Sequence, residues 1–299
     1  MSDKPLKIGY FADGPWSHEA FKLIKADSDF DIRFICPRCD TKDGTLKAFS
    51  EQYGIDYFSD KNINSEAFIN KVKGYDCDVL VSMSFNQIFK KDILSITPTG
   101  IINCHAGKLP FYRGRNILNW ALINDEKEFG ITVHFVDEGI DTGDIILQRT
   151  YPIADEDSYK TLLERAYTAC AEILYDALKQ LKNGTYTRKR QTEIHPVGMY
   201  CGIRKEGDEN LSWNQTSREI FNFVRAICRP GPMATTTLNG EKFLINAVKL
   251  VPDAPVYKGT NGQILMKSAD GLIVKTANSF VTITEYEFSG KIRVGDRFK

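Results

Sequence analysis

Two polar side chains of complementary chemistry end the run Gly100-Ile-Ile-Asn-Cys-His105. In a β-strand, residues two positions apart share a face, so Asn103 and His105 can act on one substrate while Cys104 points the other way. An asparagine amide is a neutral donor that can hold a developing oxyanion, and an imidazole, with an ordinary pKa of about 6.5, can exchange a proton near neutral pH. The pair therefore suits a reaction in which an oxygen gains negative charge and a proton moves.

A carboxylate that could orient or charge the imidazole follows in the segment Asp137-Glu-Gly-Ile-Asp-Thr-Gly-Asp144. Asp141 is the best candidate, because Gly139 and Gly143 allow a tight loop that directs a carboxylate inward. In the alternative interpretation, the Asn and Asp residues only form turns and His105 is a core residue with its hydrogen bonds satisfied. For an isolated Asn-x-His that alternative is favoured, so the catalytic hypothesis needs a wider pattern.

The elements that would position these residues alternate in type from Leu6 to about Gly184. Alternating β-rich and amphipathic helical stretches predict an α/β fold with a doubly wound, Rossmann-like, mostly parallel sheet. In such open sheets the ligand crevice lies beyond the carboxyl ends of the strands, where Asn103 and His105 would stand. The predicted strands are 6–11, 31–36, 78–85, 100–105, 131–136 and 145–151, with helices from residue 15, over 45–53 and over 158–182.

The C-terminal third of the chain has a different pattern. Residues from Thr185 to about Glu206 are polar, basic and without a clear period, which is typical of a linker. A short helix is predicted over 217–227, and brief strands separated by Gly, Asn and Asp turns predict a small, OB-like β-barrel. The expected organisation is a catalytic domain over residues 1–187, a linker over 188–206 and a small barrel domain over 207–299.

Composition restricts the partners and the compartment. Lysine plus arginine equals aspartate plus glutamate at 39 each, so the chain as a whole has no charge that would attract nucleic acid or an anionic membrane. No apolar run is typical of a signal peptide or a membrane span, which predicts a cytoplasmic protein without a membrane partner. The 7 cysteines are an odd number, and Cys36-Pro-Arg-Cys39 lacks a second pair, so neither disulfides nor a metal site is expected. No dinucleotide-binding or P-loop glycine pattern follows a predicted strand.

The wider pattern is that of a known family. The run Asn103-Cys-His-Ala-Gly-Lys-Leu-Pro-Phe-Tyr-Arg-Gly-Arg115, followed by Gly130-Ile-Thr-Val-His134 and Gly139-Ile-Asp-Thr-Gly-Asp144, resembles the signature of 10-formyltetrahydrofolate-dependent formyltransferases. Arg225-Ala-Ile-Cys-Arg-Pro-Gly-Pro232 and Lys291-Ile-Arg-Val-Gly-Asp-Arg297 are similar to the C-terminal domain of methionyl-tRNA formyltransferases and of the longer sugar formyltransferases. The resemblance implies a folate-dependent transferase that needs no metal, with the family's catalytic Asn, His and Asp at Asn103, His105 and Asp141.

The resemblance also implies how the substrates are held. The acceptor amine would attack the formyl carbon while Asn103 donates to the oxyanion and His105, paired with Asp141, takes or relays the proton. The folate pocket would be formed mainly by main-chain groups of Phe85, Asn86, Gln87, Ile88, Asp137, Gly139, Ile140 and Asp141.

Two further groups of residues are singled out by their chemistry. The acceptor is expected to contact the loop of Tyr112, Arg113, Gly114 and Arg115. Guanidinium groups match phosphates, although an arginine that pairs with a carboxylate inside the protein is an equally good interpretation of Arg113 and Arg115. His134, in the middle of a predicted strand, is expected to be structural.

The expected acceptor is a nucleotide-linked 4-amino or 3-amino deoxysugar, such as a dTDP-sugar, made for a surface polysaccharide such as the lipopolysaccharide O-antigen. Methionyl-tRNA formyltransferases usually carry a longer basic loop after the second strand, whereas residues 36–49 here carry a net charge of only +1. The run from Tyr112 to Trp120 is more similar to the sugar-nucleotide branch, where an aromatic side chain can cover a base and an arginine can hold a diphosphate. Initiator tRNA is the alternative acceptor, favoured by a net charge of +6 over residues 188–299.

Other classes of protein share some of these features. A formyltetrahydrofolate hydrolase would use the same three residues with water as the acceptor, although such enzymes typically carry an N-terminal regulatory domain that is not expected here. A non-catalytic module would bind folate without turnover. A homodimer is expected, with the predicted hairpin over residues 272–287 as a candidate contact.

Overall fold

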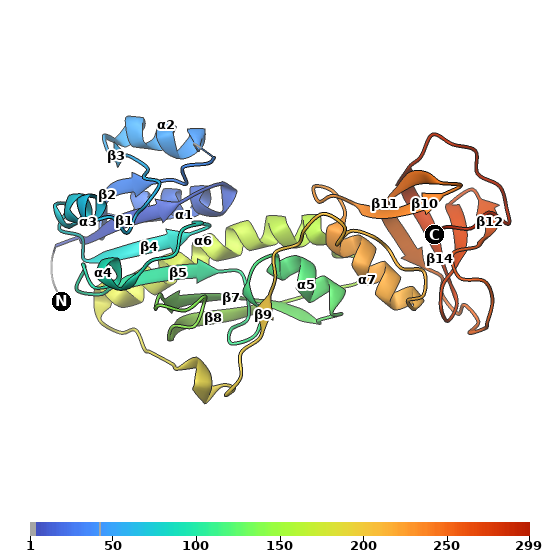
Figure 1. The fold of residues 1–299 in the computed structure, drawn as a ribbon. Helices are drawn as coiled ribbons and strands as arrows, with labels where there is room; N and C mark the ends of the chain where they lie inside the picture. The colour runs from blue at the N-terminus through green and yellow to red at the C-terminus, as the bar shows by residue number, and fades with distance from the viewer. Residues whose placement is uncertain (1–3, 42) are drawn as a thin grey trace. The chain divides into compact units, whose positions relative to one another are not determined.

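The computed structural model describes residues 4–41 and 43–299, which fall into two compact units (Figure 1). The first unit comprises the residues up to Gly114, Phe129–Tyr151 and Glu164–Cys201, and the second comprises Arg115–Glu128, Pro152–Leu163 and Gly202–Lys299. This division differs from a single boundary near residue 187. Residues 188–201 belong with the first unit, and two internal stretches belong with the second.

A seven-stranded sheet in the order β3-β2-β1-β4-β5-β7-β8 forms the centre of the first unit. The pairs among β1, β2, β3, β4 and β5 are parallel, whereas β7 runs antiparallel to β5. This arrangement confirms the predicted doubly wound, mostly parallel sheet. The strands are β1 Leu6–Ala12, β2 Phe30–Cys36, β3 Asp56–Tyr57, β4 Val79–Met83, β5 Ile101–His105, β7 Glu128–Phe135 and β8 Ile145–Pro152.

The helices of this sheet begin and end at recognisable sequence signals. Asp43 caps the start of α2 by accepting hydrogen bonds from the amides of Thr45 and Leu46, and Gly54 closes it in the left-handed region at a φ of 63°. The long apolar stripe predicted over 158–182 forms the helix α6. The helices are α1 Pro15–Ala26, α2 Gly44–Tyr53, α3 Glu66–Lys73, α4 Lys91–Leu94 and α6 Tyr159–Asn183.

Side chains along β5 alternate between the two faces of the sheet, and this alternation determines which face the polar residues at the end of the strand lie on. Ile101 is buried in the core cluster that α3 and α4 form with one face of the sheet. The Cys104 thiol points to the other face, where it donates to the carbonyl of Cys170 in α6 at 3.5 Å. Because residues two apart share a face, Asn103 and His105 continue the side of Ile101 beyond that core.

The second unit contains a closed antiparallel sheet. Its strands, in the order β10-β11-β14-β13-β12, are joined at the two edges by the end of the chain, where Phe298 bridges to Leu238 and Arg297 bridges to Gln263. This closure agrees with the predicted small barrel. The elements are α5 Ile117–Ile123, α7 Ser217–Ile227, β10 Ala234–Leu238, β11 Glu241–Leu250, β12 Ile264–Ser268, β13 Gly271–Lys275 and β14 Phe280–Glu287.

Residues 188–201, called the connecting segment below, return to the first unit after α6. The segment contains a short 3-10 helix, η1 Gln191–Glu193, and the strand β9 Tyr200–Cys201, which pairs in parallel with β6 Arg113–Gly114. None of the helices that the structure describes combines the length and apolar character that a membrane crossing requires.

Candidate active site

Three elements of the first unit bring the predicted catalytic residues together. Asn103 and His105 end β5, and the antiparallel pairing of β7 places His134 directly opposite Asn103. Asp141 comes from the loop that follows β7. Its carboxylate lies 3.6 Å from His105 Nδ1 and 3.4 Å from His134 Nε2, and the Asn103 amide nitrogen donates to Asp141 Oδ1 at 3.5 Å.

The Asp141 carboxylate is held by its own loop and by the main chain of a second loop. The residue adopts a left-handed φ of 53°, which a non-glycine residue tolerates only where the surroundings hold it. The Gly114 amide donates to Asp141 Oδ2 at 2.8 Å. Burial opposes ionisation, but the imidazoles of His105 and His134 and the Gly114 amide outweigh it and hold the pKa of Asp141 well below its usual range. The site therefore presents a fixed negative charge to two imidazoles.

The His105 ring has one nitrogen engaged with the main chain and one facing the carboxylate. Its Nε2 lies 2.7 Å from the carbonyl oxygen of Tyr112, and because a carbonyl only accepts, Nε2 carries a hydrogen and donates. The ring is 8% exposed. Proton exchange with a substrate is therefore left to Nδ1, the atom that faces Asp141.

His134 lies beside the amide of Asn103. Its Nδ1 donates to the carbonyl of Phe135 at 2.7 Å, and its Nε2 lies 3.3 Å from the Asn103 amide nitrogen and 3.4 Å from Asp141 Oδ1. The ring is 2% exposed, as expected of a residue within a strand. Nevertheless, His134 lies within 3.4 Å of two of the three catalytic candidates, which makes it a candidate positioning residue. The only sequence signal for this role is its place in the Gly-Ile-Thr-Val-His motif.

The absence of a side chain at Gly107 allows His105 Nε2 to approach the carbonyl oxygen of Tyr112. A Cβ atom at this position would collide with His105 Nε2 and with the Tyr112 carbonyl oxygen, whereas a Cβ on Gly44 would meet nothing. We expect Gly107→Ala to push these two atoms apart and to lower kcat by about tenfold or more, because misplacing a catalytic group by a fraction of an ångström is costly.

Gly44→Ala is the matched control and should keep the turnover of the unaltered protein. The two substitutions are compared by initial rate and by thermal unfolding. Equal rates for Gly107→Ala and Gly44→Ala would show that the hydrogen bond from His105 to Tyr112 is not needed.

The four residues expected to contact the acceptor differ in their surroundings. Tyr112 is buried at a left-handed φ of 56°, and its carbonyl serves His105. The Arg113 guanidinium donates to the Gln191 side-chain oxygen at 2.6 and 3.0 Å and stacks over the ring of Tyr200. The Gly114 amide donates to the Asp141 carboxylate. Arg115 is exposed and begins the second unit. Contact of these residues with an acceptor stays a prediction.

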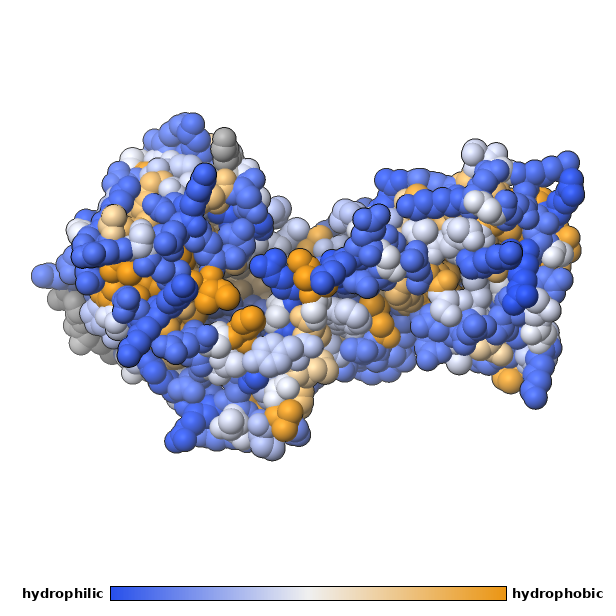
Figure 2. All heavy atoms as spheres, viewed as in Figure 1, coloured by the Kyte–Doolittle hydropathy of each residue, from blue (hydrophilic) through white to orange (hydrophobic). Residues whose placement is uncertain are grey.

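In the segments predicted to bind folate, several polar side chains are hydrogen-bonded within the protein, whereas two apolar side chains are exposed. Gln87 donates to the carbonyl of Asp60, Asn86 donates to Asp40, and Asp137 accepts from Gly139 and Thr142 within its own loop. By contrast, Ile88 and Ile140 are 59% and 52% exposed. Figure 2 shows such apolar side chains interrupting the hydrophilic surface of the first unit. Phe85 is half-buried against the core cluster. Binding of a pterin ring by these segments stays a prediction.

The Cys36-Pro-Arg-Cys39 motif is not part of this site. The Cys36 thiol is buried, and this burial raises its pKa well above the usual range. Among residues 4–41 and 43–299, no group of three or more His, Cys, Asp or Glu side chains is arranged to hold a metal ion.

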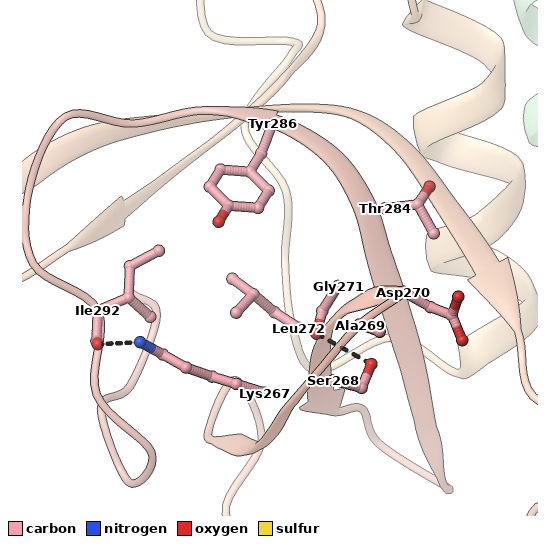
Figure 3. Close-up of a pocket in the computed structure, with 9 residues that line it drawn as sticks. All are labelled: Lys267, Ser268, Ala269, Asp270, Gly271, Leu272, Thr284, Tyr286 and Ile292. Carbon is pink, nitrogen blue, oxygen red and sulfur yellow. Dashed lines mark hydrogen bonds between the residues drawn. The ribbon is translucent and has the colours of Figure 1, made fainter.

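A pocket of about 300 Å³ lies in the second unit, beside the β12–β13 hairpin (Figure 3). In its wall Lys267 Nζ donates to the carbonyl of Ile292 at 2.5 Å and Ser268 Oγ donates to that of Gly271 at 3.2 Å. These polar groups are thus already occupied, and none of the predicted catalytic residues lines the pocket. Its lining residues are Lys267, Ser268, Ala269, Asp270, Gly271, Leu272, Thr284, Tyr286 and Ile292.

Comparison with known proteins matches both parts of the chain. Residues 12–178 match the family described as Formyl transferase, and residues 203–296 match Formyl transferase, C-terminal domain. The methionyl-tRNA formyltransferase of Ruminiclostridium cellulolyticum is 31% identical over 249 residues, which are 83% of this chain and 79% of that protein.

Two solved structures share the fold. The N-formyltransferase from Helicobacter canadensis, in complex with folinic acid and dTDP-3-aminofucose, has a TM-score of 0.70 at 19% identity, covering 94% of this chain and 100% of that one. WlaRD, a sugar 3N-formyl transferase solved in the presence of dTDP and 5-N-formyl-THF, has a TM-score of 0.69 at 20% identity, covering 94% of this chain and 97% of that one.

Proposed function

We propose, from the premise that the chain belongs to the formyltransferase family and is a folate-dependent formyl transfer enzyme, that its acceptor is the amine of a nucleotide-linked amino deoxysugar. The nucleotide we favour is dTDP, with the amine at carbon 3 or carbon 4 of the sugar. The product would enter a surface polysaccharide such as a lipopolysaccharide O-antigen.

The short loop between β2 and α2 is the observation that carries this choice of acceptor. The strand ends at Cys36 and the helix begins at Gly44. Within the loop, Arg38 donates from Nε and Nη2 to both oxygens of Asp40, at 3.0 and 2.7 Å. Lys42, which the sequence charge count includes, lies outside the described residues. Because the loop is short and Arg38 is already paired with Asp40, the described part of the loop has few positive groups with which to bind the phosphates of a tRNA acceptor stem.

The fold neighbours support the same acceptor. One was solved with dTDP-3-aminofucose and the other with dTDP, and each of these structures covers 94% of this chain. Both were also solved with a formylated folate, which agrees with a formyl-folate as the co-substrate here. The exposed isoleucines at positions 88 and 140 would hold its ring, with the main chain of the Asp141 loop.

In the proposed mechanism, four side chains have separate roles in formyl transfer. The formyl-folate supplies the group to be moved. The Asn103 amide nitrogen lies against His134, and the hydrogen that it directs at Asp141 would turn to the oxygen on which negative charge develops. His105, anchored through Nε2, receives the proton of the attacking amine at Nδ1, and Asp141 stabilises the resulting imidazolium. The bond between the formyl carbon and the folate nitrogen then breaks, the imidazolium gives its proton to that nitrogen, and the formylated amine and tetrahydrofolate leave.

Initiator tRNA is the second candidate acceptor, and both a similar protein and the charge of the C-terminal part of the chain favour it. The methionyl-tRNA formyltransferase of Ruminiclostridium cellulolyticum is similar over 83% of this chain, at higher identity than the two sugar formyltransferases. The net charge of +6 over residues 188–299 would also suit a nucleic acid.

A panel of acceptors tests the proposal. We expect the purified chain, given 10-formyltetrahydrofolate, to formylate a dTDP-amino deoxysugar in preference to UDP- and GDP-aminosugars and to charged initiator tRNA. The readouts are the release of tetrahydrofolate and the mass of the formylated product. A dTDP-sugar with a hydroxyl in place of the amine is the control and should not react. Turnover of the charged tRNA alone would overturn the sugar acceptor.

A further inference from the structure

The connecting segment, expected from its sequence to be a linker, is hydrogen-bonded to the first unit at several points. Lys189 and Ile145 exchange both main-chain hydrogen bonds at 2.9 Å. Farther along, the Met199 amide donates to the carbonyl of Pro110 at 3.1 Å, and the Arg113 amide donates to that of Met199 at 3.0 Å. The segment is therefore a built part of the unit that contains the catalytic residues.

Gln191 stands within this segment with its side chain turned inward and only 3% exposed. Its amide nitrogen donates to the carbonyls of Asp141 and Gly143, both at 2.8 Å. Its amide oxygen accepts from Nε and Nη2 of Arg113, at 3.0 and 2.6 Å. Carbonyls only accept and a guanidinium only donates, so these partners fix the orientation of the amide.

The partners of Gln191 belong to the two loops that place the catalytic carboxylate. On one side Gln191 holds the main chain at Asp141, where the left-handed conformation needs support from outside. On the other side it holds Arg113, which lies between Tyr112, whose carbonyl accepts from His105, and the amide that donates to Asp141. Movement of either loop would change the 3.6 Å separation between His105 and Asp141.

We propose that Gln191 is a positioning residue for formyl transfer, which sets the place of Asp141 relative to His105 without touching either substrate. Each hydrogen bond of its side chain ends on one of the two loops around the carboxylate. The inference goes beyond the acceptor proposed above and rests only on the formyl transfer reaction.

Two substitutions separate this role from simple packing. Gln191→Met keeps the length of the side chain and removes its four hydrogen bonds, so we expect kcat to fall by about 10- to 100-fold with little change in the KM for the formyl donor. Gln191→Glu keeps an acceptor for Arg113 but sets a carboxylate against two carbonyl oxygens, so it should not restore the rate. Thr192→Ala, at the exposed next position, is the matched control and should have the kcat of the unaltered protein.

The imidazoles give a readout that needs no acceptor. The chain contains 4 histidines, so ¹⁵N labelling of this residue type gives a spectrum simple enough to assign by substitution. In Gln191→Met we expect the ring nitrogen chemical shifts of His105 and His134 to change, because both rings face Asp141. The shifts of His18, which pairs with Asp43 elsewhere in the unit, should stay the same.

The rates are compared with whichever acceptor the unaltered protein uses, so failure of the sugar proposal does not affect this test. A Gln191→Met protein that is folded by circular dichroism, keeps the kcat of the Thr192→Ala control and leaves the His105 and His134 resonances unmoved would overturn the role of Gln191. A loss of activity that is accompanied by equal shifts of all four histidines would also overturn it, since that pattern marks general disruption.

Discussion

Replacing His105 with alanine is expected to lower kcat/KM for formyl transfer by at least about 100-fold, the usual size of a lost acid-base group. The ring nitrogen that the main chain does not engage, Nδ1, faces the Asp141 carboxylate at 3.6 Å. We expect Asn103→Ala to cause a loss of the same order, because it removes the donor aimed at the developing negative charge. Both losses should appear in kcat more than in the KM for the folate, and both are measured as initial rates of tetrahydrofolate release.

Cys104 provides the matched control, because it lies between the two catalytic candidates and points to the opposite face of β5. We expect Cys104→Ala to lose some stability, since it removes a buried thiol that packs against α6, and to keep most of its turnover. Near-normal rates for folded Asn103→Ala or His105→Ala protein would contradict the catalytic assignment. A loss in Cys104→Ala as large as in the other two would show that β5 as a whole, and not its polar face, is sensitive.

Much of the fold follows from local signals in the sequence. The predicted helix over 217–227 is observed as Ser217–Ile227, and the strand predicted over 31–36 begins one residue earlier, at Phe30. The helices Glu66–Lys73 and Ile117–Ile123 were not predicted, because two turns are too short for a helical period to stand out from its surroundings. No local pattern predicts that β7 runs antiparallel to β5, because the direction of a strand depends on the topology of the whole sheet.

In the candidate site, too, some residues could be predicted from local sequence patterns and others could not. Asn103 and His105 could be chosen because the two-residue period of a strand places them on one face, and Asp141 because glycines flank it. His134 gains its role only through the register of β7 against β5, which sets it opposite Asn103. Gln191 lies in a stretch without periodicity, so nothing local distinguishes it from the neighbouring polar residues.

Replacing Asp141 with asparagine is the second change expected to have a large effect. It removes the negative charge that stabilises an imidazolium at His105, while an amide oxygen can still accept from the Gly114 amide. We expect kcat/KM to fall by at least about 100-fold, which corresponds to about 2.7 kcal/mol of transition-state stabilisation. Asp144→Asn removes the same charge three residues along the loop and should have a much smaller effect. Equal losses in the two variants would indicate that the loop's total charge matters and that the Asp141 carboxylate has no special place.

Stability should respond to pH in a way that identifies the same carboxylate. The folded-state pKa of Asp141 lies below its unfolded value, near 3.9, so the unfolded chain binds more protons between the two values. The contribution of Asp141 to the free energy of unfolding is therefore complete above about pH 4 and is lost as the pH falls through the folded-state pKa. Urea unfolding between pH 3 and pH 7 should show a smaller loss on acidification for Asp141→Asn than for the unaltered protein, with Asp144→Asn following the unaltered protein. If Asp141→Asn lost as much stability on acidification as the unaltered protein, the Asp141 carboxylate would not be held in its ionised form by the two imidazoles. It could then not stabilise a positive charge on His105 during catalysis.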